Sequence, residues 1–153
     1  MYKRILVPTD GSPISGQAVD AAIELARACG SAIVALSIAE PAPAIPSVEA
    51  AMVVDPGQQV NELLEHAHGF AAAVAERARA AGIACTPIAS FMPDTAQAIV
   101  GAAREHGCDL IVMGSHGRRG LSRLLAGSVT QAVLAHAPVP VMVLRPGAGA
   151  SAT

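Results

Sequence analysis

Apolar residues are arranged along the chain in two patterns that alternate from one end to the other. Short continuous apolar runs are typical of strands buried on both faces, whereas apolar residues that recur every three or four positions indicate helices that bury one side. The continuous runs predict five strands, at residues 3–7, 32–38, 83–90, 110–113 and 139–144. The periodic stretches predict four helices between them, at residues 13–29, 56–81, 95–106 and 128–136.

Residue types at the predicted helix ends support these boundaries. Ser12 and Asp55 are good capping residues, and each precedes a proline, which suits the first helical position. Asp94, with Gln97 three residues later, fits a capping box, and Ser128 would either cap the last helix or donate its hydroxyl to a phosphate. A glycine, the usual residue after a helix, follows each of the first three helices, at Gly30, Gly82 and Gly107.

Strict alternation of strand and helix predicts an α/β fold, a single-domain doubly wound parallel sheet with helices on both faces. We expect residues 1–146 to form this domain and residues 147–153 to be a disordered tail. Pro87 in the third strand lacks a backbone donor, so that strand should lie at a sheet edge. If the first and fourth strands are neighbours, the loops after them face one crevice at the carboxyl ends, where such sheets bind ligands.

Composition argues against several classes of function. The chain has 153 residues, 52% of them apolar, and a net charge of −2, which does not favour binding to duplex nucleic acid. Two Phe, one Tyr and no Trp provide little surface for stacking single-stranded bases. No apolar run reaches the roughly 18 residues that span a membrane, and the start of the chain lacks a signal-peptide pattern, so we expect a cytoplasmic protein.

The three cysteines do not indicate a disulfide framework or a zinc site, because they are far apart in the sequence and form no C-x-x-C motif. Four prolines between residues 40 and 56 predict a long irregular loop. This loop would either fold over a site or be a plain surface connection.

The richest chemical signal lies between residues 108 and 146. The predicted fourth strand is followed by Gly114, Gly117 and Gly120 at every third position, and by the start of the last predicted helix. Glycines allow backbone N–H groups to approach an anion, and a helix N-terminus adds donors with a partial positive charge. The spacing alone leaves phosphate binding and a plain turn equally open, because neither of the two best-known nucleotide motifs is present.

Several side chains near this turn are candidates for chemistry. Asp10, at the end of the first strand, would bind ribose hydroxyls or a metal, or would serve only the turn. His116 would touch phosphate or transfer a proton, or would be a solvated turn residue. Arg118 and Arg119, with Arg123, would contact phosphate or form a solvated face. The sequence shows no Ser-His-Asp or Cys-His arrangement, and we predict no catalytic residue.

Two motifs together resemble the nucleotide-binding branch of the universal stress protein family. That branch carries G-x-x-G, nine residues and then G-[ST]. Here residues 114–117 read Gly-Ser-His-Gly, nine residues follow, and Gly127 and Ser128 complete the pattern. Residues 5–12, which read ILVPTDGS, also resemble the first strand and turn of that family. The resemblance covers nearly the whole chain and makes phosphate binding the favoured interpretation.

The resemblance implies a five-stranded sheet in the order 3-2-1-4-5, with ATP between strands one and four and with Mg²⁺ or Mn²⁺ bridging the phosphates. No protein metal ligand is implied. Asp10 and Gly114 would hold the ribose, and Pro8, Ile38 and Met113 would surround adenine. The phosphates would lie against Gly117, Gly127, Ser128, Val129 and Thr130, and Thr9, His116, Arg118 and Arg119 complete the candidate nucleotide-binding residues.

The resemblance also implies a homodimer in which strand five pairs antiparallel with its copy. The sequence supports this independently, because an exposed apolar edge strand is prone to unwanted pairing. Pro140 removes one donor, so the pairing should centre on residues 141–144. For function we expect an ATP-binding regulatory protein of the stress response, whose nucleotide occupancy an unknown protein partner reads. A slow ATP hydrolase is the alternative, and a dimeric module that needs no ligand is the third interpretation.

Overall fold

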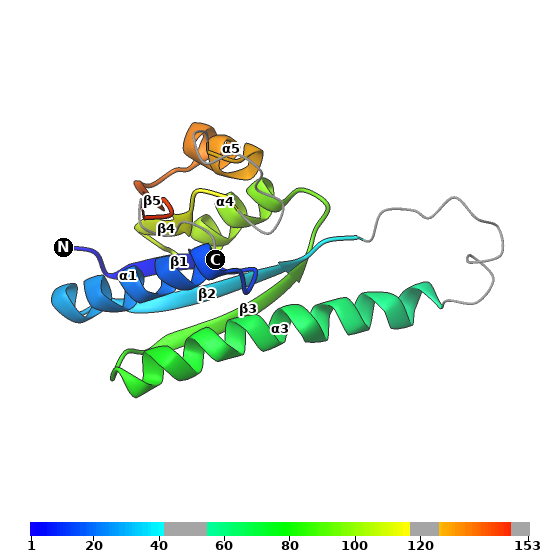
Figure 1. Ribbon diagram of the computed structural model, residues 1–153, viewed down its shortest axis with the longest axis horizontal. Helices are drawn as coiled ribbons and strands as arrows, with labels where there is room; N and C mark the ends of the chain where they lie inside the picture. The colour runs from blue at the N-terminus through cyan, green and yellow to red at the C-terminus, as the bar shows by residue number, and fades with distance from the viewer. Residues whose placement is uncertain (42–54, 117–125, 148–153) are drawn as a thin grey trace.

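The computed structural model describes residues 1–41, 55–116 and 126–147, and within them the chain forms one five-stranded sheet (Figure 1). All of its strand pairs are parallel, and the order is β3-β2-β1-β4-β5. This confirms the predicted α/β class and the strand order that the resemblance implied. The strands are β1 (Arg4–Pro8), β2 (Ala32–Ala39), β3 (Cys85–Phe91), β4 (Leu110–Gly114) and β5 (Val141–Leu144).

Helices cover both faces of the sheet, because successive strand residues point to opposite sides. On one face, Ile5 and Val7 of β1 pack with α1 (Pro13–Cys29) and α3 (Pro56–Ala80). On the other face, Leu6 of β1 packs with α4 (Thr95–Glu105), and Val133 of α5 (Ser128–His136) joins the same cluster. The core is therefore two aliphatic layers with the sheet between them.

Capping side chains fix the starts of the first three helices, as the sequence predicted. The side chains of Ser12, Asp55 and Asp94 accept hydrogen bonds from backbone N–H groups in the first turns of α1, α3 and α4. Of the two roles predicted for Ser128, the cap is wrong, because Ser128 is the first residue of α5 and Gly127 takes the cap position. Gly127 has no side chain to cap with, so α5 begins without a side-chain hydrogen bond.

Three strands begin later than predicted, and for β1, which starts at Arg4, the difference is a single residue. β3 starts at Cys85, because the backbone N–H of Ile83 still bonds to the carbonyl of Ala78 and closes the end of α3. β5 starts at Val141, because Pro140 lacks an N–H, although its carbonyl accepts from Ile111. As Pro87 indicated, β3 is an edge strand.

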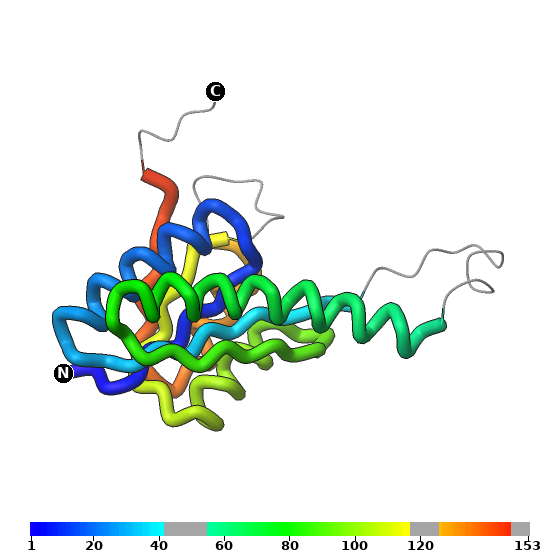
Figure 2. The backbone as a smooth tube through the Cα atoms, turned by 90° about the horizontal axis from the view of Figure 1, so that it is seen from below, coloured from blue at the N-terminus to red at the C-terminus, as the bar shows by residue number. Residues whose placement is uncertain are grey.

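The N-terminal half of α3 extends past the end of the sheet, as Figures 1 and 2 show. The buried residues of α3 begin at Ala67 and lie in its C-terminal half. Leu63 and Phe70 have the helical spacing of buried residues, but these side chains are only half-buried because the sheet ends beneath them. None of the helices within the described ranges is long and apolar enough to cross a membrane. The expected loop at 40–56 and the tail lie largely outside the described residues.

Candidate functional site

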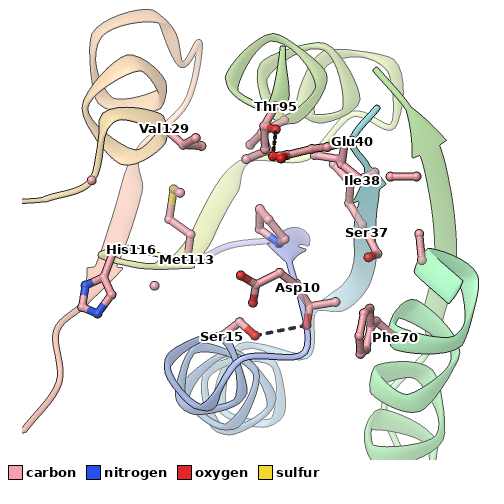
Figure 3. A pocket seen from close by; sticks show the side chains of 18 of the residues that line it. Asp10, Ser15, Ser37, Ile38, Glu40, Phe70, Thr95, Met113, His116 and Val129 are labelled. Carbon is pink, nitrogen blue, oxygen red and sulfur yellow. Dashed lines mark hydrogen bonds between the residues drawn. The ribbon is translucent and has the colours of Figure 1, made fainter. Parts of the chain in front are cut away.

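A cleft with a volume of about 510 Å³ opens at the carboxyl ends of β1, β2 and β4 (Figure 3). Helices α1, α3, α4 and α5 contribute the surrounding walls. Every predicted site residue that the structure describes lines this cleft: Pro8, Thr9, Asp10, Ile38, Met113, Gly114, His116, Gly127, Ser128, Val129 and Thr130. The other three, Gly117, Arg118 and Arg119, lie outside the described residues.

The end of β1 carries a carboxylate whose position is set by the turn that follows. The backbone N–H of Thr9 donates to the carbonyl of Leu36 at 2.8 Å, and its hydroxyl lies 3.3 Å from that of Ser15. Asp10 Oδ1 accepts from the backbone N–H of Ser12 at 2.9 Å. With these bonds the Asp10 side chain lies in the cleft beside the first turn of α1 (Figure 3).

The start of α5 is tied to the end of β4. The Thr130 hydroxyl donates to the carbonyls of Gly114 at 3.2 Å and Ser115 at 3.0 Å, and the Gly127 N–H donates to the same Ser115 carbonyl at 2.8 Å. The Thr130 side chain is fully buried by this arrangement. Its hydroxyl is therefore used within the protein.

Gly114 has a packing reason as well as a predicted binding role. A Cβ at this position would lie 3.0 Å from Cγ1 of Ile14, which is tighter than ordinary contact. Glycine therefore lets α1 approach the end of β4. Next along the chain, His116 Nδ1 lies 3.0 Å from the hydroxyl of Ser115, which holds the half-buried ring at the edge of the cleft (Figure 3).

The N-terminus of α5 gives the cleft a positive end. The backbone N–H groups of Ser128, Val129 and Thr130 precede the first intrahelical bond, which runs from Gln131 N–H to the Gly127 carbonyl at 3.0 Å. Helix N-termini carry about half a positive charge on such unpaired donors. Among the described helices, α5 alone lacks a capping side chain, so its donors remain available to an anion.

The cleft residues that the sequence did not single out include two ring-bearing side chains and a hydrogen-bonded polar pair. From α3 come His66 and Phe70, whose rings meet edge to face with centroids 4.8 Å apart. Glu40 directly follows β2. Thr95 is the first residue of α4, and its hydroxyl donates to Glu40 Oε1 at 2.7 Å. Periodicity had placed Phe70 in a buried stripe, and no local motif marks the other three.

Solved structures with a similar fold support the architecture. A universal stress protein family structure from Burkholderia pseudomallei is 30% identical, with a TM-score of 0.75, and the match covers 95% of this chain and 97% of that one. The protein MJ0577 is 26% identical, with a TM-score of 0.80 over 96% of this chain and 98% of that one.

Three universal stress proteins that share the fold at lower identity were solved with nucleotides. One, 24% identical with a TM-score of 0.64, is in complex with cAMP. Another, from Archaeoglobus fulgidus, is 19% identical with a TM-score of 0.66 and is in complex with dAMP. The third, from Arabidopsis thaliana, is 19% identical with a TM-score of 0.68 and has AMP bound.

The sequence itself matches the same family over almost its whole length. The model of the universal stress protein family matches residues 1–145. A universal stress protein from Methanocaldococcus jannaschii is 32% identical over 147 residues, which covers 95% of this chain and 83% of that protein. The chain therefore belongs to the universal stress protein family.

Proposed function

We propose that the cleft binds ATP and that the chain is a cytoplasmic regulatory protein of the stress response, whose nucleotide occupancy a partner protein reads. The observation that carries the proposal is the uncapped N-terminus of α5, which presents backbone donors to a cleft with apolar walls. Relatives that share the fold bind AMP, dAMP and cAMP, and this supports an adenine nucleotide.

The cleft suits a nucleotide in its volume and in the way that its polar and apolar residues are arranged. Its volume of about 510 Å³ falls within the range of small-molecule sites. The phosphates would accept from the backbone N–H groups of Ser128, Val129 and Thr130, where the helix dipole favours negative charge. Asp10 would accept from the ribose hydroxyls, and Ile38 and Met113 would pack against the base. The residues of the chain thus bind and orient the ligand without a covalent step.

The remaining predictions for the phosphate end rest on the family resemblance. Gly117 would leave room for the phosphates, and Arg118 and Arg119 would add positive charge beside the last of them. Mg²⁺ or Mn²⁺ would be held through phosphate oxygens and would neutralise part of their charge. Among the described residues, no group of three His, Cys, Asp or Glu side chains could hold a metal ion.

Slow hydrolysis of ATP is the alternative function. Hydrolysis needs a group that orients water beside the terminal phosphate. His116 is the described cleft side chain at the α5 end that is capable of proton transfer, and its Nδ1 already lies beside the Ser115 hydroxyl. The contact with Ser115 holds the His116 ring in place, and it does not direct the ring at a water molecule. We therefore favour the regulatory function.

We also propose that the protein is a homodimer formed through β5. One side of β5 pairs with β4, and within the described part of the chain its other side has no strand partner. Met142 on this strand is 40% exposed although it is a large apolar residue. Antiparallel pairing with a second copy would cover the strand edge and supply its missing hydrogen bonds.

Nucleotide content tests the function directly. The protein would be purified without added nucleotide and denatured, and the released small molecules would be separated by anion exchange beside standards. Bound ATP in a near-equal molar amount supports the regulatory protein, and ADP alone supports the hydrolase. Calorimetry with ATP and Mg²⁺ on stripped protein completes the test. An empty protein that also fails to bind added ATP would refute the proposal.

A further inference from the structure

The side of the cleft that lies opposite His116 carries a polar pair whose role the binding of phosphate does not explain. The Thr95 hydroxyl, at the start of α4, donates to Oε1 of Glu40 at 2.7 Å. Both residues line the cleft, and the Glu40 carboxylate points into it from the end of β2 (Figure 3). The two residues are 55 positions apart in the sequence, so the fold alone brings them together.

Charge fixes which end of a nucleotide can lie near this pair. Three helix N-termini, those of α1, α4 and α5, stand at the cleft, and the side chain of Ser12 already caps that of α1. The α4 terminus is already supplied with carboxylates, because Asp94 caps it and Glu40 accepts from its first residue. A phosphate there would meet like charge, whereas the α5 terminus has no side-chain cap. Phosphates are therefore directed to α5, and the base extends across β1 toward β2.

We infer that Glu40, held in place by Thr95, selects purines that carry a 6-amino group over those that carry a 6-oxo group. This inference rests on the proposed nucleotide binding and specifies which base the site takes. An ionised carboxylate only accepts hydrogen bonds, and its two oxygens offer about four lone-pair positions, so it can accept from several donors at once. The exocyclic amine of adenine is a donor, whereas O6 of guanine or hypoxanthine is an acceptor that would face the carboxylate unpaired.

Thr95 is a positioning residue in this arrangement. Its hydroxyl donates to one carboxylate oxygen, which reduces the number of rotamers that Glu40 samples and keeps the carboxylate at the cleft. A site with its acceptor fixed in place discriminates better than one that must be ordered on binding. Loss of the hydroxyl should therefore weaken base discrimination without changing which base is preferred.

The test compares ATP with inosine triphosphate (ITP), which differs from it only at the 6-position and the adjoining ring nitrogen. Affinities of both for the full chain with Mg²⁺ are measured by calorimetry. We expect the wild type to prefer ATP by about tenfold or more, the range of one hydrogen bond to a charged group. Glu40→Gln replaces an acceptor by a group that can also donate to O6, so the preference should fall to about twofold or less.

Two controls separate the effect from net charge and from folding. Glu62→Gln removes the same charge from α3 at an exposed residue outside the cleft lining, and it should keep the wild-type preference. Thr95→Val should reduce the preference, and Thr95→Ser, which keeps the hydroxyl, should restore it. Circular dichroism checks that each variant is folded.

The outcomes distinguish this inference from the function on which it rests. If the wild type binds ATP and ITP equally, or if Glu40→Gln keeps the full preference, base selection by Glu40 is refuted while nucleotide binding stands. If neither nucleotide binds the wild type, the proposed function itself fails and the inference fails with it.

Discussion

Replacing Gly127 by Asp should make the nucleotide-free protein more stable and the nucleotide-binding site worse. Gly127 has φ −61° and ψ 163°, close to the φ −72° and ψ 158° of the capping residue Ser12, so the backbone already suits a side-chain cap. A Cβ at Gly127 would lie 3.5 Å from the Cα of His116, which is ordinary contact. Sterics therefore permit a larger residue at this position.

The stability gain has three parts. An Asp cap exceeds a Gly cap by a few tenths of a kcal/mol, its charge interacts with the α5 dipole for about 0.3–1 kcal/mol, and loss of glycine from the unfolded chain adds about 0.4–1 kcal/mol. The total of about 1–2 kcal/mol corresponds to a rise in Tm of roughly 2–8 °C for a chain of this size.

The binding loss has the opposite sign and is larger. The new carboxylate would occupy the α5 N–H groups that the phosphates need and would repel them. Two unit charges about 4 Å apart near a protein surface interact by about 4 kcal/mol. Allowing for screening by salt, we expect ATP affinity to fall by about a hundredfold or more.

The assay is thermal unfolding of stripped protein together with calorimetry of ATP with Mg²⁺. Stripping matters because residual ATP would itself raise the Tm of the wild type. Gly127→Asn is the matched control, since it caps the helix without the charge and should lose less affinity. If Gly127→Asp binds ATP as tightly as the wild type, the phosphates do not lie at α5. If its Tm falls, the cap geometry is wrong.

Three further predictions test other parts of the molecule. Asp10→Ala should weaken ATP binding measured by calorimetry, while circular dichroism shows a folded chain; unchanged affinity would remove Asp10 from the site. Met142→Asp should give monomers by light scattering, and it is preferable to Leu144→Asp because Leu144 packs partly on the core; a stable dimer would exclude β5 as the interface. Desolvation acts to raise the pKa of the Asp109 carboxyl, but backbone N–H groups of Lys3 and Arg4 bond to it and hold that pKa below the ordinary 3.8. The free energy of unfolding in urea should therefore be higher for the wild type than for Asp109→Asn above about pH 4. This difference should disappear as the pH falls through the lowered pKa, and a difference that persists in acid would contradict the prediction.

The sequence by itself determined the elements of this protein and their order. Apolar periodicity, the prolines after Ser12 and Asp55, and the cap at Asp94 are local signals, because each acts within one turn of chain. Alternation of strand and helix then required a parallel sheet, and right-handed crossovers follow from its twist. The glycine motif, read with the family resemblance, indicated the cleft residues on β1, β4 and α5 and the strand order.

The tertiary structure decided what no local pattern could contain. The helical spacing of Phe70 is the same whether the side chain is buried on the sheet or faces a cleft, and it lines the cleft because α3 extends past the end of the sheet. The Thr130 hydroxyl could have faced a ligand, but the approach of α5 to β4 directs it to two carbonyls. Glu40 meets Thr95 only through the strand order, which places the end of β2 beside the start of α4. The physical reason is the same in each case. Contacts between segments far apart in sequence depend on how whole elements pack, and the periodicity within one element does not determine that packing.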